Sequence, residues 1–291
     1  MRSLDDDDET VAVDLKQGAS SAQPAWMRAL RQSCVEWLDV LPKVRPSCPT
    51  STRLGPSDAA QDPLARFYQR EASLAASLLP TIRADLGDLV KVCDGELKQT
   101  NDLRALLLDL AKGTVPSSWR RYRCRELPVG IWIADLAKRL TQLATVVESA
   151  DLAKVPVALG LLFHPHGFIT ASRQAVAHAT QASLEELSLE VALEETGGDN
   201  SFIIEGFSLV GASLQNSALA LNDGSTVRLA ASSVSWRRSA GASSPSEATK
   251  VSIPCFLDAT RTDVLFTVSV PAKGVDAVAV KQRAVALVAA E

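Results

Sequence analysis

Three histidines are the side chains in this sequence best suited to metal chemistry. His164 and His166 flank Pro165, and His178 lies further along the chain. Two histidines around a proline can turn toward one point, but a zinc site needs further ligands and converging side chains. We favour the alternative that His164-Pro165-His166 is a loop leading into a helix. A metal-assisted hydrolase that uses His164 and His166 is kept as a hypothesis, which an assay for stoichiometric zinc would test.

The segment from Trp119 to Arg125 interleaves four arginines with two aromatic residues in the order Trp-Arg-Arg-Tyr-Arg-Cys-Arg. Such a cluster can grip phosphates or a nucleic-acid backbone. It can also form an interface in which the aromatic rings pack and the arginines pair with carboxylates of a neighbouring surface. The chain has a net charge of −4 and is not basic elsewhere. We therefore favour the interface, with no nucleic-acid partner.

Sequence motifs for nucleotide, metal or acyl chemistry are missing. The sequence contains no G-x-x-x-x-G-K-[ST], G-x-G-x-x-G, H-E-x-x-H or G-x-S-x-G. A serine triad is recognised by geometry, so spacing alone neither supports nor excludes one. Five glutamates are predicted to form a solvated face: Glu185, Glu186, Glu190, Glu194 and Glu195. We predict no catalytic, cofactor-binding or metal-binding residue, no cofactor, and a protein that is not an enzyme by itself.

Composition points to the cytosol. The N-terminus carries an acidic run at residues 5–9 and no basic segment followed by an apolar one, so no signal peptide is predicted. The longest apolar stretch, residues 155–163, is interrupted by Pro156 and falls short of the roughly 20 residues that a bilayer requires. Five cysteines without a C-x-x-C pair are typical of reduced thiols. No membrane partner is expected.

The first half of the sequence is predicted to be helical. Residues 1–23 are predicted to be a disordered acidic tail, and the proline-rich residues 42–63 a loop. Asp62-Pro63 has the N-cap and first-turn signature of a helix whose apolar face continues to Cys93 and which ends at Gly95. Pro80 is expected to kink or split this helix. A second helix is predicted over residues 100–112.

The period of the apolar pattern changes in the second half. Helices are expected over residues 132–147 and 167–179, and Ser183 begins a short helical turn with a capping-box pattern. Alternation of apolar and polar residues then predicts strands at residues 187–193, 202–210, 217–221, 227–230, 234–237, 251–257 and 264–270. Asn222-Asp223-Gly224 is predicted to be a turn between two of these strands. The fold class is therefore α+β: an N-terminal helical segment, then further helices (residues 128–187), and then strands (residues 187–291) that form a small antiparallel sheet or barrel.

Several stretches, in order along the sequence, resemble the C-terminal end of cytoplasmic dynein heavy chains. They include Pro24-Ala25-Trp26-Met27-Arg28, Asp62-Pro63-Leu64, Lys98-Gln99-Thr100-Asn101, Trp119-Arg120-Arg121-Tyr122, Leu159-Gly160-Leu161-Leu162-Phe163, Phe168-Ile169-Thr170-Ala171-Ser172 and Arg261-Thr262-Asp263-Val264. The likeness extends from about residue 24 to the C-terminus. Two features depart from it: residues 1–23 have no recognised counterpart, and Pro80 lies in a helix that the family usually leaves unbroken.

The resemblance implies a division at residue 115. Residues 24–115 would be the helical small subdomain of the last AAA+ module of the motor ring, and residues 116–291 the C-terminal domain of the heavy chain. In that domain, helices (residues 128–187) would be followed by a small antiparallel β-barrel (residues 187–291). It further implies a non-catalytic segment that docks on the ring and modulates minus-end-directed microtubule motility. Its partners would be the rest of the heavy chain and the other dynein subunits, with microtubules reached only through the parent motor, in the cytoplasm and at the cytoskeleton. The competing hypothesis is an unrelated cytosolic adaptor that binds partner helices through the apolar stripe of residues 64–110.

Overall fold

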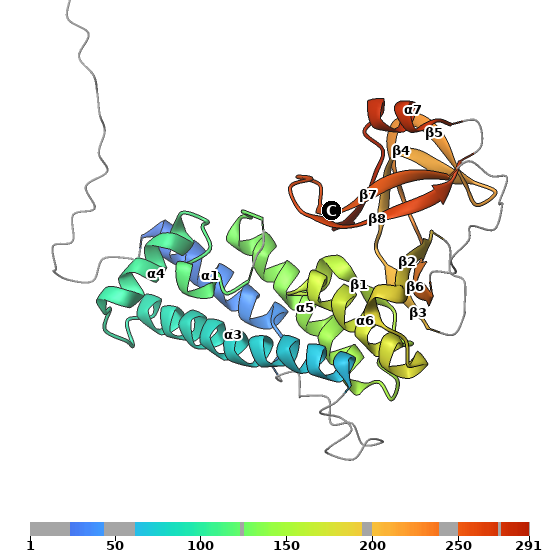
Figure 1. Ribbon diagram of the computed structural model, residues 1–291. Coiled ribbons are helices and arrows are strands. Elements are labelled where there is room, and N and C mark those ends of the chain that lie inside the picture. The colour runs from blue at the N-terminus through green and yellow to red at the C-terminus, as the bar shows by residue number, and fades with distance from the viewer. Residues whose placement is uncertain are drawn as a thin grey trace, which may run out of the picture.

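Helices make up one layer of the molecule. The computed structural model describes residues 24–43, 62–122, 125–193, 200–238, 250–272 and 275–290. The helical layer contains α1 (Ala25–Val40), α3 (Pro63–Cys93), α4 (Asn101–Ala111), α5 (Val129–Glu148) and α6 (Pro165–Thr180), with short 3-10 turns η1 (Ser117–Trp119), η2 (Leu159–Leu161) and η3 (Leu184–Glu186) between them (Figure 1). Within these ranges no helix is both long and apolar enough to cross a membrane. The predicted acidic tail, residues 1–23, lies outside the described residues.

The helix α3 is the long central element of this layer. It begins as predicted: the Asp62 carboxylate accepts a hydrogen bond from the Leu64 amide at 2.9 Å, and Pro63 occupies the first turn, where its missing N–H costs nothing. Its apolar face is buried against α1, α5 and α6. Arg83 ties α1 to α3 by donating to the carbonyl oxygens of Leu38 and Leu41 at 2.9 and 3.1 Å. The stripe proposed for an adaptor is thus covered by helices of the same molecule.

Pro80 does not split α3, so one of the two outcomes predicted for it is excluded. The helix continues from Pro63 to Cys93 with Pro80 inside it. Leu78 and Ile82, on either side of the proline, are fully buried, and the Thr81 hydroxyl donates to the Ser77 carbonyl at 3.1 Å. Burial of the flanking turns holds the helix together although the proline supplies no backbone donor.

Replacing Pro80 with alanine is expected to raise the free energy of unfolding by about 1–2 kcal/mol, because alanine restores the missing backbone donor and removes the clash of the ring with the preceding turn. Urea denaturation of the Pro80→Ala variant and the parent protein measures this difference. A variant no more stable than the parent would show that α3 has already relaxed around the proline at no cost.

Two mixed sheets form the other layer. The four-stranded sheet has the order β1 (Val157–Ala158), β3 (Ser201–Glu205), β6 (Ser232–Arg238), β2 (Leu187–Ala192), and the five-stranded sheet the order β5 (Ala218–Arg228), β4 (Ser208–Gln215), β9 (Ala286–Ala290), β7 (Lys250–Asp258), β8 (Val264–Pro271). A short helix, α7 (Ala277–Gln282), precedes β9. The α+β class is confirmed. The predicted barrel is not: the sheets do not close, and β1–β3 and β7–β9 pair in parallel.

Two strand predictions needed correction. The single strand expected over residues 202–210 is broken at Gly206, whose φ of 80° lies in the left-handed region, into β3 and β4. The turn at Asn222-Asp223-Gly224 forms, with the Gly224 amide donating to the Asn222 side chain at 3.0 Å, but it lies inside β5. The β4–β5 pairing is irregular there and resumes beyond it, so the turn residues make a bulge and the strand continues.

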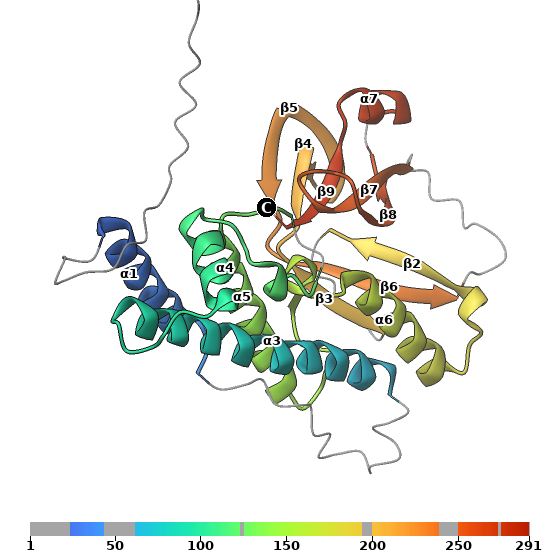
Figure 2. The same cartoon turned by 90° about the vertical axis from the view of Figure 1, so that its left-hand side faces the viewer.

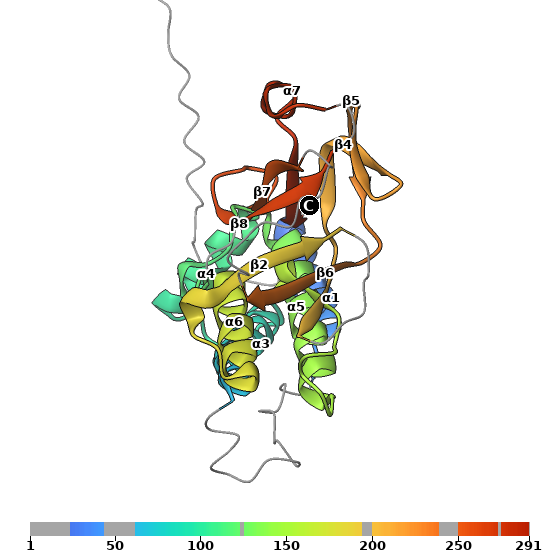
Figure 3. The ribbon, with the colours of Figure 1, turned by 45° about the vertical axis from the view of Figure 1, so that its right-hand side comes forward.

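The two layers share one hydrophobic core. Figure 2 shows the helices on one side and the sheets on the other, and Figure 3 shows α6 beside the four-stranded sheet. Phe168 of α6 packs edge-on against Phe202 of β3 with ring centroids 6.0 Å apart. The Trp236 indole of β6 donates to the Ser172 hydroxyl at 3.0 Å. The buried cluster is continuous across residue 115, since Phe168 also meets Phe67 of α3 at 5.8 Å.

Candidate functional site

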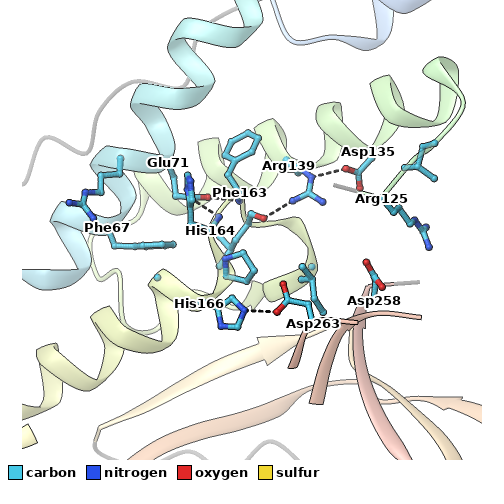
Figure 4. Close-up of a pocket in the computed structure, with 17 residues that line it drawn as sticks. Phe67, Glu71, Arg125, Asp135, Arg139, Phe163, His164, His166, Asp258 and Asp263 are labelled. Carbon is cyan, nitrogen blue, oxygen red and sulfur yellow. Dashed lines mark hydrogen bonds and ion pairs between the residues drawn. The ribbon is translucent and has the colours of Figure 1, made fainter. Parts of the chain in front are cut away.

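A cleft of about 660 Å³ opens where α3, α5, the start of α6 and the end of β7 meet. Its apolar lining comes from Phe67, Leu127, Leu162, Phe163 and Leu257. Its ionisable groups are Arg70, Glu71, Arg125, Asp135, Arg139, His164, His166, Asp258 and Asp263 (Figure 4). The cleft therefore combines an apolar lining with charged groups brought together from distant parts of the sequence.

Glu71 is the most buried charged group of this cleft, with 1 % of its surface exposed. It lies on α3 one turn after Phe67, on the face that packs against the loop before α6. Its carboxylate accepts from the backbone amides of Phe163 at 2.7 Å and His164 at 3.1 Å, and contacts His164 Nδ1 at 2.8 Å. Burial raises the pKa of Glu71 above its usual range, and these hydrogen bonds oppose the rise. Glu71 thus fastens this loop to α3.

Arg139 of α5 holds the same loop from the other side. Its guanidinium donates to the Leu162 carbonyl at 2.6 Å and to the Asp135 carboxylate, also at 2.6 Å, and lies over the Tyr122 ring at 5.2 Å from the centroid. The side chain is nearly buried, so these bonds replace the water it has lost. Three consecutive residues, Leu162 to His164, are therefore bonded through their backbone to two buried charges on two helices.

The histidines of the loop turn to different carboxylates. His164 pairs with Glu71 of α3, and His166 Nε2 lies 3.0 Å from Asp263, in the connection between β7 and β8. His164 occupies the N-cap position of α6 without a capping hydrogen bond from its side chain, and Pro165 occupies the first turn, so the prediction of a loop leading into a helix is confirmed. Throughout the described part of the sequence, no three His, Cys, Asp or Glu side chains converge on a common point where a metal ion could bind. The geometry gives His164 the role of connecting α3 to the start of α6, and His166 the role of connecting the β7–β8 loop to it.

The arginine-rich segment splits into a buried aromatic half and an exposed basic half. Trp119 and Tyr122 each stack with Trp132, with ring centroids 5.9 Å apart in both pairs, and the Trp119 indole donates to Asp85 at 2.7 Å. Burial raises the pKa of the Asp85 carboxyl, and the indole hydrogen bond opposes the rise. Arg120, Arg121 and Arg125 are exposed. Arg123 and Cys124 lie outside the described residues.

The acidic cluster after α6 forms an exposed face where it is described. Glu185, Glu186 and Glu190 are exposed. Glu190 of β2 forms an ion pair with Arg237 of β6 at 2.9 Å, and Glu186 of η3 forms one with Arg238 of β6 at 3.5 Å. Exposed pairs of this kind contribute little to stability. Glu194 and Glu195 lie outside the described residues.

Sequence reasoning missed Glu71 and Arg139. The available signal was a charged residue at a position of an apolar stripe: Glu71 follows Phe67 by four residues and precedes Leu74 by three, and Arg139 falls in the stripe from Trp132 to Val147. A charge at such a position is buried with a partner. The partners of Glu71 are 92 and 93 residues away, which no local pattern reveals.

A family model for the C-terminal domain of dynein heavy chains matches residues 7–289. The protein belongs to this family. The dynein match lies on both sides of residue 115, and it includes every residue of the cleft. It begins within residues 1–23, where no counterpart was expected. The resemblance inferred from the ordered sequence stretches is confirmed, and a protein unrelated to dyneins is excluded.

Curated dynein relatives show the same likeness. The sequence is 35 % identical to the cytoplasmic dynein heavy chain of Drosophila melanogaster over 290 residues, which covers 92 % of this chain and 6 % of that protein. It is 32 % identical to the Dictyostelium discoideum cytoplasmic dynein heavy chain over 247 residues, with 83 % of this chain and 5 % of the relative covered. The Caenorhabditis elegans cytoplasmic dynein heavy chain is 38 % identical over 206 residues, with 70 % and 4 % covered. This dynein component thus spans a small fraction of the relatives it matches.

Proposed function

We propose that this protein is the non-catalytic C-terminal segment of a dynein motor heavy chain, which docks on the AAA+ ring and modulates minus-end-directed movement along microtubules. The observation that carries the proposal is the family match over residues 7–289. Its partners are the remainder of the heavy chain and the other dynein subunits, and it acts at microtubules through the parent motor in the cytoplasm. Residues 24–115 would form the helical small subdomain of the last AAA+ module, and residues 116–291 the C-terminal domain.

A shared core gives this proposal a mechanical basis. Glu71 and Arg139 fasten one loop to two helices, and the buried cluster continues from α3 to the sheets. A segment that moves as one body and contacts several ring modules restricts their relative motion, and so favours some ring conformations over others. The dynein segment would then influence force and processivity without taking part in ATP hydrolysis.

The test is a motor in which the matching C-terminal residues of the Drosophila melanogaster cytoplasmic dynein heavy chain are replaced by this protein. We expect the replacement to give a stall force and run length, measured in an optical trap, closer to the intact motor than to one truncated before the segment. Values equal to those of the truncated motor would contradict the proposed docking. The purified protein alone is expected neither to hydrolyse ATP nor to co-sediment with microtubules, and robust hydrolysis would contradict the non-catalytic assignment.

A further inference from the structure

The cleft continues into a second hollow. This hollow has a volume of about 460 Å³ and is lined by Val115, Arg120, Glu126 and Trp132 among others, and it shares Arg125 and Leu127 with the cleft. The two hollows together, from Arg120 past Arg125 to Arg70, are called the arginine groove below. The groove therefore runs from the segment after α4 to the start of α3.

The carboxylates of the cleft are occupied by donors of the protein itself. Asp135 accepts from Arg139, Asp263 contacts His166, and Asp258 accepts from the backbone amide and hydroxyl of Thr260. Glu71 accepts three bonds from the loop before α6. Each of these carboxylates therefore already has at least one partner within the protein.

Two arginines of the groove have donors to spare. Arg70 is exposed and makes no hydrogen bond or ion pair with any residue that the structure describes. Arg120 uses its Nε to reach the Val115 carbonyl at 3.0 Å, and its two terminal nitrogens have no partner among the described residues. A guanidinium carries five N–H donors in a planar fork that fits a carboxylate. The unmet capacity of the groove is thus for an acceptor that carries negative charge.

Apolar side chains lie among the charged groups that line the groove between these arginines, including half-buried Leu127 and Leu257 and the ring of Phe163. We propose that the arginine groove binds an extended acidic peptide segment in which carboxylates alternate with aliphatic or aromatic side chains. Separate carboxylates can be placed at Arg70 and Arg120 with apolar side chains between them. A continuous phosphate backbone fits less well, because it would also pass the acidic groups of the cleft. The proposal depends on the groove alone and is independent of the role in a motor.

The binding experiment uses the full-length protein and a fluorescein-labelled peptide of repeated Asp-Glu-Leu-Phe units. The affinity is measured from the fluorescence anisotropy of the peptide. The double variant Arg70→Glu, Arg120→Glu is expected to bind the peptide about tenfold more weakly or worse, because two attractive contacts become repulsive. The double variant Arg28→Glu, Arg104→Glu is the matched control, since Arg28 is exposed on α1, Arg104 is exposed on α4, and neither lines either hollow. It makes the same change of charge and is expected to leave the affinity unchanged.

Further measurements distinguish binding in the groove from general electrostatic attraction between the peptide and the protein surface. Glu126→Gln removes the exposed carboxylate of the second hollow and is expected to tighten peptide binding. Circular dichroism spectra that match the parent would show that the arginine variants fold, as exposed positions should allow. The proposal is overturned if the parent protein does not bind the peptide, if the double reversal binds as well as the parent, or if a single-stranded RNA oligonucleotide binds more tightly than the peptide.

Discussion

Replacing Glu71 with alanine is expected to lower the free energy of unfolding by about 3–5 kcal/mol, among the largest effects of any single substitution in this protein. The substitution removes the acceptor for the amide of Phe163 and for the amide and ring of His164. It leaves the buried Phe163 amide unsatisfied, whereas the exposed His164 side chain can bond to water. It also leaves a gap where a side chain of 1 % exposure had been. Urea denaturation monitored by circular dichroism measures this decrease in the free energy of unfolding.

Two variants make this expectation specific to the hydrogen bonds of Glu71. Glu71→Gln preserves the shape and one acceptor, so it should cost clearly less than alanine. Glu96→Ala removes an exposed carboxylate just beyond the end of α3 and is expected to stay within about 0.5 kcal/mol of the parent. If Glu71→Ala lowered the free energy of unfolding no more than Glu96→Ala does, the Glu71 carboxylate would not be what fastens the loop before α6 to α3. Faster hydrogen exchange at the amides of Phe163 and His164 in the alanine variant would locate the loss at this loop.

Replacing Trp132 with alanine is expected to cost about 3–5 kcal/mol as well, because it empties a large volume in the core. The Trp132 side chain is fully buried and stacks with both Trp119 and Tyr122. Losing it exposes both rings to a cavity and removes the packing that positions the arginine-rich segment on α5. Thermal and urea unfolding of Trp132→Ala provide the measurement.

The preceding residue supplies the control for this substitution. Ile131 lies on the same helix with 56 % of its surface exposed, and Ile131→Ala is expected to change the free energy of unfolding by no more than about 0.5 kcal/mol. Trp132→Phe keeps an aromatic ring and should fall between the two. Equal effects of Ile131→Ala and Trp132→Ala would mean that the aromatic stack does not account for the cost.

Helix starts were predictable because their determinants are local. Asp62 and Thr100 each cap a helix by accepting from an amide two or three residues ahead, and Pro63 and Pro165 occupy first turns. Gly113, with a φ of 74°, directly follows the helix predicted over residues 100–112. Interactions within one turn of a helix depend on residues that are close together in the sequence, so the sequence alone determines them. The α+β class followed from the change of period for the same reason.

The strand pairings and the cleft were decided by the tertiary structure. Nothing near β7 indicates that it pairs in parallel with β9, and the turn residues at 222–224 gave no sign that β5 would continue through them. The aromatic and charged residues around the cleft come from α3, α5, the loop before α6 and the end of β7.

The sequence by itself determined the helical caps, the change from helices to strands and the family. Only the tertiary structure decided that Glu71 and Arg139 are bound to one loop, and that Arg120 and Arg70 face the same groove. Both decisions depend on contacts between residues far apart in the sequence, and such contacts form when apolar faces are buried together. A charged residue on a buried face acquires its role from the partner that packing brings to it.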